Sequence, residues 1–211
     1  MDRVAIKAKA KEFAFSNKWN VWKAILLISA ISSIVTAVTG SFSSSENTNM
    51  LGSLLSFAFS LALMPMQVGL ASYLLKLVRG KKDLVLTEEL FAFYKGDKLW
   101  EIIKVSIIAE LIIFAFTLLL IIPGIIYAIK FAMLSFVLAE QSEKEMKEEK
   151  AYKVSEKMMD GHKWEYFVFQ LSFIGWYLLC GLTLGILYIW VVPYVTVANT
   201  MWYEEIKKIS K

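Results

Sequence analysis

The chain has 211 residues, of which 57% are hydrophobic and 20% charged, and its formal net charge is +4. A soluble domain is usually about 45–50% apolar and about 25% charged, so this composition is typical of a membrane protein and excludes an intrinsically disordered chain. The single cysteine excludes an intramolecular disulfide and a thiolate zinc cluster, and the single histidine excludes a His-rich metal site. We therefore expect no metal and no cofactor.

Six stretches of the chain are strongly apolar, and a helix needs roughly 20 such residues to cross a bilayer. They are residues 21–39, 51–77, 99–122, 124–139, 167–183 and 186–203. The fourth and fifth are short and adjoin tight turns at 123–124 and 184–185. We expect helical hairpins whose turns reach the far interface, and a re-entrant pair buried in protein is the alternative. The sequence thus predicts one all-α membrane domain over 1–211, a polytopic bundle of six transmembrane helices.

The basic residues predict the orientation of these helices. The loop expected on the far side, 41–49, has no Lys or Arg, whereas the segments expected inside hold nearly all of the positive charge. The positive-inside rule then places the N- and C-termini in the cytoplasm. We interpret the basic residues as facing anionic lipid headgroups in the cytoplasmic membrane rather than nucleic acid.

Short cytoplasmic amphipathic helices are expected between the spans. Residues 1–20 form a basic leader, which lies on the inner leaflet or simply precedes the first span, with an apolar side made by Val4, Ile6, Ala10 and Phe13. Residues 80–98 contain a short helix capped by Thr87 and ended by Gly96. Residues 141–160 form a helix with an apolar stripe of Ala151, Val154 and Met158, which is either a solvated connection or a docking surface for a partner.

Two ionisable residues fall at membrane depth, Glu110 in the third span and Lys130 in the fourth. Such groups are costly in hydrocarbon, so they usually face the bundle interior and pair. We predict a Glu110–Lys130 ion pair, which either fixes the register of the hairpin or serves as a proton or ion relay.

Pro65 and Pro193 interrupt the second and sixth spans and are candidate helix kinks, which can line a substrate site in transporters. Cys180 lies in an apolar span and is expected to be a small buried hydrophobe. The chain has no phosphate-binding loop and no nucleophile or metalloprotease motif. We therefore expect that it is not an enzyme and has no catalytic residues.

A longer pattern follows in VSEKMMDGHKWEYFVFQLSFIGWYLLCGLTLGILYIWVVPYVTVANTMWY and the earlier IIPGIIYAIKFAMLSFVLAE. Together these resemble the signature of a bacterial multi-pass membrane family, domain of unknown function 975, found mainly in Gram-positive bacteria. The matching positions are Pro123, Gly124, Tyr127, Ser155, Met159, Gly161, His162, Lys163, Phe167, Ser172, Phe173, Gly175, Trp176, Gly185, Pro193, Tyr194 and Tyr203.

The resemblance implies a bacterial inner-membrane protein without an assigned function. A looser similarity links the chain to the membrane domain of some glycerophosphodiester phosphodiesterases, whose catalytic barrel is absent here. The signature residues mark the cytoplasmic start of the fifth span. There Gly161 lets the chain turn, and His162 and Lys163 are candidate contacts to a lipid headgroup.

We expect a non-enzymatic accessory or scaffold factor for an envelope or export complex, or for protection against membrane-active peptides. The expected partners are membrane lipids and either another membrane protein or a second copy of the chain. The alternative is a small carrier or lipid-handling protein that uses Glu110 and Lys130. A polar cavity that reaches Glu110 favours the carrier, and a dry, tightly packed bundle favours the scaffold.

Overall fold

The computed structural model describes residues 2–43, 49–81, 84–94, 97–141 and 151–210, and within these ranges the chain is helical without a strand. The expected all-α class is therefore confirmed. In chain order the helices are α1 (Arg3–Ser16), α2 (Lys18–Ser43), α3 (Asn49–Val78), α4 (Leu86–Phe91), a 3-10 turn (Ala92–Tyr94), α5 (Asp97–Leu119), α6 (Ile121–Lys130), α7 (Leu134–Gln141), α8 (Ala151–Met159), α9 (Lys163–Leu171), α10 (Ile174–Leu182) and α11 (Tyr188–Ile209).

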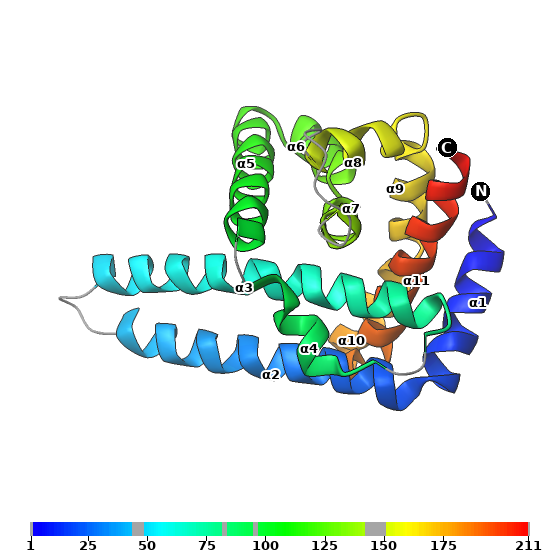
Figure 1. The fold of residues 1–211 in the computed structure, drawn as a ribbon, viewed down its shortest axis with the longest axis horizontal. Helices are drawn as coiled ribbons and strands as arrows, with labels where there is room; N and C mark the ends of the chain where they lie inside the picture. The colour runs from blue at the N-terminus through cyan, green and yellow to red at the C-terminus, as the bar shows by residue number, and fades with distance from the viewer. Residues whose placement is uncertain (1, 44–48, 82–83, 95–96, 142–150, 211) are drawn as a thin grey trace.

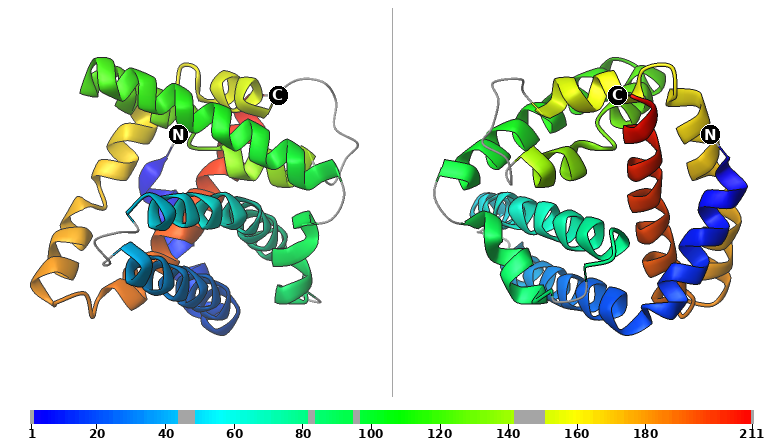
Figure 2. Two further views of the ribbon diagram at one scale, coloured as in Figure 1. Left: turned by 90° about the vertical axis from the view of Figure 1, so that its left-hand side faces the viewer. Right: turned by 45° about the vertical axis from the view of Figure 1, so that its right-hand side comes forward.

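The helices pack mainly in three pairs, and α3 contacts an element of each pair. The long helices α2 and α3 lie side by side, α5 packs against α6, and α1 packs along α11. In Figure 1 the two chain ends are neighbours, because α1 begins beside the end of α11. Figure 2 shows α9 and α10 descending on one side and α11 returning from the turn that joins α10 to α11.

The four largest of the fully buried side chains, Trp202, Tyr203, Phe169 and Phe173, lie on α11, on α9 and directly before α10. Trp202 and Phe169 are fully buried with their ring centroids 4.6 Å apart, and Tyr203 stacks on Phe136 at 5.2 Å. Cys180 is also buried, as expected for a small hydrophobe. The core therefore forms where the C-terminal helices meet α1, α3 and α7.

The expectation of six membrane spans is wrong. Among the described residues three helical stretches are long and apolar enough to cross a membrane: Ala58–Val78, Ile122–Gln141 and Lys163–Leu182. A fourth is added if the bent pair Arg3–Ser16 and Trp19–Val35, which meet at 88°, is one broken span. These stretches correspond to the second, fourth, fifth and first of the predicted six.

The third and sixth predicted spans are the helices α5 and α11. The described part of α5 carries Glu101, Lys104 and Glu110, and α11 carries Asn199 and two glutamates near its end. A polar residue is costly against lipid but not against a protein partner. α11 is largely buried among other helices, so its polar groups find partners there. Hydrophobicity alone therefore does not show whether this helix crosses the membrane.

One of the two predicted hairpin turns is displaced. The chain reverses at Leu120, whose backbone is extended, and Pro123 then lies in the first turn of α6, where a missing N–H costs nothing. Gly124 instead allows close packing, because a Cβ there would lie 2.8 Å from the Cα of Thr117 on α5. The second turn is where it was predicted, with positive φ at Leu184 (50°) and Gly185 (86°).

The leader helix is more firmly packed than expected. In α1, Ile6 and Ala10 are buried and Phe13 is half-buried, whereas Val4 is exposed and Ala14 is buried instead. Its apolar side thus contacts protein, mainly α11.

The two other short helices differ from their predictions in their ends. The helix α4 begins after Val85, so Thr87 is not its cap, and Gly96 lies outside the described residues. The predicted helix 141–160 is described only over α8, and Gly161 with φ of 77° ends it as expected.

Candidate functional site

A network of charged side chains forms where α3, α7 and α11 end. The carboxylate of Glu140, 19% exposed, is an ion-pair partner of both Arg79 and Lys207, and it accepts a hydrogen bond from the Tyr203 hydroxyl at 2.9 Å. The Lys207 Nζ lies 2.6 Å from Glu140 Oε1. One acid therefore joins three helices at their ends.

Arg79 extends this network to a second acid. Arg79 follows the last residue of α3, and Gly80, with φ of 84°, ends the turn there. The Nε of Arg79 donates to Glu204 Oε1 at 2.8 Å. Burial lowers the pKa of Arg79, but the hydrogen bonds to Glu140 and Glu204 outweigh burial and raise this pKa above its ordinary value. The guanidinium is thus a permanent positive charge at the end of α3.

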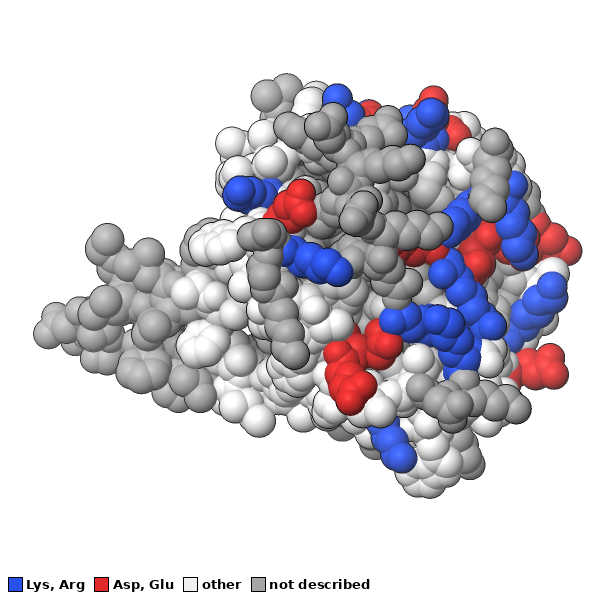
Figure 3. All heavy atoms as spheres, in the orientation of Figure 1, with Lys and Arg blue, Asp and Glu red and all other residues white. Residues whose placement is uncertain are grey.

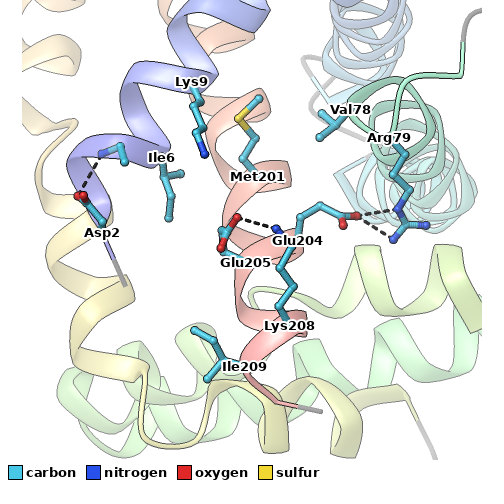
Figure 4. A pocket seen from close by; sticks show the side chains of 11 residues that line it. Asp2, Ile6, Lys9, Val78, Arg79, Met201, Glu204, Glu205, Lys208 and Ile209 are labelled. Atoms are coloured by element: carbon cyan, nitrogen blue, oxygen red, sulfur yellow. Dashed lines mark hydrogen bonds and ion pairs between the residues drawn. The ribbon is translucent and has the colours of Figure 1, made fainter.

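The same end of the molecule is hollowed by a pocket of about 470 Å³ between α1, α3 and α11 (Figure 4). Its rim carries three cations and three carboxylates: Lys9, Arg79, Lys208, Asp2, Glu204 and Glu205. Its floor is apolar and consists of Ala5, Ile6, Val78, Met201 and Ile209. Lys208 donates to Glu205 at 2.8 Å, which raises the pKa of Lys208. The pocket therefore offers charges of both signs around an apolar base.

Lys130 does not have the partner that the sequence analysis predicted. Its Nζ lies 2.6 Å from Glu156 Oε1 on α8 and 4.3 Å from the centre of the Tyr127 ring. Ser155, fully buried, donates to the Lys130 carbonyl at 2.8 Å, which satisfies an acceptor that the end of α6 would leave unpaired. The cluster therefore ties α8 onto the end of α6.

Glu110 lies on α5, away from the Lys130 cluster. It lines a cleft of about 250 Å³ between α3, α5 and α7, together with Gln67, Ser106 and Ser135 and the apolar Met64, Val68, Ala109, Ile113, Phe131, Leu134 and Leu138. A carboxylate, an amide and two hydroxyls thus share one cleft, and these groups can together hold a proton or a small cation.

The candidate headgroup residues His162 and Lys163 line different cavities. His162, whose Nδ1 lies 3.1 Å from Glu165 Oε2, faces a hollow between α8 and the end of α11. Lys163 lines a groove between α6 and α9, and its Nζ lies 2.8 Å from Asp160 Oδ1. This hydrogen bond holds the pKa of Asp160 below its ordinary value.

The two candidate kinks lie inside continuous helices. Pro65 is within α3 and Pro193 within α11, where it is buried. Pro193 also lines a small apolar hollow with Trp22, Ile25 and Leu26 of α2. The expected kinks stay predictions.

Sequence reasoning missed the acid that organises the charged end. Glu140 is separated from Arg79 by 61 residues and from Lys207 by 67, so no spacing rule connects them. A second missed group is the half-buried contact of Gln170 with Asn199, in which the Gln170 Nε2 donates to Asn199 Oδ1 at 2.8 Å. The available signal was a lone acid at the end of an apolar run, because such residues usually find a cation.

Several signature residues turn out to be structural joints. Ser155 caps α6, and Tyr203 donates to Glu140. Ser172 accepts a hydrogen bond from Lys7 of α1 at 2.8 Å. Among the described residues there is no group of three His, Cys, Asp or Glu side chains that could hold a metal ion.

Comparison with known proteins gives one match. The family model described as Protein of unknown function (DUF975) matches residues 101–210, just over half of the chain. No curated protein and no solved structure matches. The looser similarity to a glycerophosphodiester phosphodiesterase membrane domain stays a prediction.

Proposed function

The chain belongs to the family described as Protein of unknown function (DUF975), and we propose that it is a non-enzymatic accessory or scaffold factor embedded in the bacterial cytoplasmic membrane. Its partner is another membrane protein of an envelope or export complex, and protection against membrane-active peptides is one task of such a complex. Both termini face the cytoplasm in this proposal.

The observation that carries the proposal is the separation of apolar and charged surface along α11. The end of α10 and the turn before α11 expose large apolar side chains, with Leu182 80%, Leu184 94% and Ile186 69% exposed. The other end carries Glu204, Lys207 and the pocket described above. In Figure 3 the charged atoms on the visible face are densest on the right, where the chain ends lie, and further charged groups lie along the top and in the lower middle. Exposed apolar tips of this kind are stable in lipid and costly in water.

The charged pocket is the contact surface that we propose for the partner. Its apolar floor fits one apolar side chain, and its rim of mixed charge fits a segment with charges on either side of that chain. The rim charges are already paired with each other in part, as Arg79 with Glu204 shows. Mixed, partly paired charges favour specificity over tight binding.

The helix α8 is a weaker candidate for this contact. Ala151 and Met158 of its predicted stripe are buried and Val154 is half-buried, so the stripe packs on the bundle itself. This favours the solvated connection over the docking surface.

The test is crosslinking of the tagged protein in its native host, followed by purification in mild detergent and mass spectrometry. Lys9→Glu reverses a charge on the rim of the pocket, and the matched control Lys11→Glu makes the same change on the same helix away from the pocket. We expect a stoichiometric partner that is lost from Lys9→Glu and kept by Lys11→Glu. A protein that is purified alone, or equal recovery from both variants, contradicts the proposal.

The Glu110 cleft supports a second candidate function, a small carrier for protons or another small cation. The cleft groups Glu110 with three other polar side chains on otherwise apolar walls, and polar groups around Glu110 are the feature that favours a carrier over a dry scaffold. Lys130 is no part of this site, because it pairs with Glu156.

Proton flux into proteoliposomes with a trapped pH-sensitive dye tests the carrier. Glu110→Gln should abolish the flux, whereas Glu101→Gln, an exposed acid on the same helix outside the cleft, should keep it. No flux in the wild type, or the same flux in both variants, contradicts this second candidate.

A further inference from the structure

An apolar groove runs between α6 and α9. It has a volume of about 480 Å³, which lies within the usual size range of small-molecule sites, roughly 300–1,000 Å³. One wall is the face of α6 that repeats at helical spacing, Ile122, Ile125, Ile126 and Ile129. The other wall is the first turns of α9, with Trp164 and Phe167. Every lining side chain except Lys163 is thus a hydrocarbon or an aromatic ring.

The place of the groove indicates what covers it. Both walls belong to stretches that are long and apolar enough to cross a membrane, Ile122–Gln141 and Lys163–Leu182. Ile122 and Trp164 are each 72% exposed, so the groove opens outward rather than into the core. In a bilayer an outward-facing groove between two such helices is in contact with acyl chains.

The lysine lies at the first residue of its stretch, where a membrane helix meets the headgroups. A lysine ammonium has three N–H donors. Among the described residues Lys163 has one hydrogen-bond acceptor, Asp160, whose side chain is 76% exposed. The two further donors can bind the oxygens of a phosphate. Exposed Trp164 beside it is the residue type that favours the headgroup region.

We propose that this groove binds one phospholipid, with an acyl chain along the isoleucines of α6 and the phosphate against Lys163. His162 takes no part, because it lines another cavity. The site is independent of the accessory and carrier functions, and the test below involves no partner and no transport.

The experiment is native mass spectrometry of delipidated protein in mild detergent, titrated with dioleoyl phosphatidylglycerol and with dioleoylglycerol, which lacks the phosphate. We expect tighter binding of the phospholipid to the wild type. Lys163→Gln should lower the affinity for the phospholipid about tenfold, the usual effect of one charge-assisted hydrogen bond. The affinity for dioleoylglycerol should stay unchanged.

Two tryptophan variants test the groove itself. Ile126→Trp fills the groove and should lower the affinity for both lipids. Ile125→Trp takes the place of this variant if Ile126→Trp does not fold. Leu118→Trp, a change at an exposed leucine outside the groove, should weaken neither. Wild-type affinity in both groove variants overturns the proposal.

Asp160→Asn tests the lysine in the opposite direction. It removes the competing carboxylate and should tighten phospholipid binding, which a merely structural role of the Lys163–Asp160 pair does not explain. Equal weakening of both lipids by Lys163→Gln, or no gain from Asp160→Asn, overturns the role assigned to Lys163.

Discussion

Glu140 is the single residue on which the charged end depends most. Two cations and one hydroxyl converge on its carboxylate, and few of its atoms reach solvent. Glu140→Gln keeps the shape but removes the charge, which leaves Arg79 and Lys207 without their shared anion. We expect the protein to lose about 2–3 kcal/mol of stability, measured by thermal unfolding in detergent.

The matched control for this change is Glu205→Gln. Glu205 pairs with Lys208 at the surface, and exposed pairs are worth about 0–1 kcal/mol. The control should therefore unfold within a degree or two of the wild type, on the usual scale of stability per degree. Equal losses in the two variants contradict a central role for Glu140.

Gly124 gives a second test at a single residue. An added Cβ would lie 2.8 Å from Thr117 Cα and 2.9 Å from Thr117 Cβ, so Gly124→Ala must push α6 away from α5. We expect a loss of about 1–3 kcal/mol, the usual cost of overpacking, in the same unfolding measurement. Gly175→Ala is the control, because nothing lies within 4 Å of its added Cβ. A harmless Gly124→Ala contradicts the close packing of the hairpin.

At the scale of the element, the leader helix α1 is an integral part of the bundle. Ala10 is fully buried in α1, whereas Ala8 on the same helix is exposed. Ala10→Leu should force α1 away from the bundle and cost about 1–3 kcal/mol, while Ala8→Leu should have little effect. Limited proteolysis measures this as earlier release of the N-terminal segment. Identical digestion of the two variants indicates that α1 lies free.

The hydrophobic pattern predicted the helices well where the surface that a helix presents to its surroundings is apolar throughout. The apolar runs found the stretches at Ala58–Val78, Ile122–Gln141 and Lys163–Leu182, and Gly185 located the turn before α11. The pattern failed for α11, because hydropathy does not distinguish a helix buried in protein from one facing lipid. It also misplaced the turn at Pro123, since proline is equally compatible with the first turn of a helix.

Contacts between side chains were less predictable than helices. The Glu110–Lys130 pair was inferred from similar depth in neighbouring helices. The structure shows that Lys130 instead meets Glu156, an acid from the predicted surface helix. Sequence gives depth along an axis, but the direction in which a side chain points depends on helix rotation, and α8 folding back over α6 was not foreseeable from spacing. Glu140 was missed for the same reason.

At the scale of the whole molecule, the packing of α1 along α11 brings the two chain ends together (Figure 1). Ends that lie side by side are on the same side of a membrane. With that side being the cytoplasm, as we propose, fluorescent-protein fusions at the N-terminus and at the C-terminus should both be fluorescent. Alkaline phosphatase fused at either end should be inactive.

An opposite result for the two fusions would contradict this packing. A reporter inserted after Leu184 serves as the internal comparison, because this exposed turn lies at the other end of α11 from the charged pocket. It should respond in the opposite way to both termini, because in our proposal α11 crosses the membrane inside the bundle, among the other helices.

The buried thiol of Cys180 makes the exposed turn measurable in time. It is the chain's only cysteine, its side chain is buried, and its backbone carbonyl accepts the N–H of Gly185 at 2.8 Å, so the turn closes on the residue that carries the thiol. A reagent can alkylate it only when the turn opens, and the rate then reports the population of open molecules, as hydrogen exchange does for amides. The rate of alkylation of Cys180 in the unmodified protein therefore reports how often this exposed apolar turn opens.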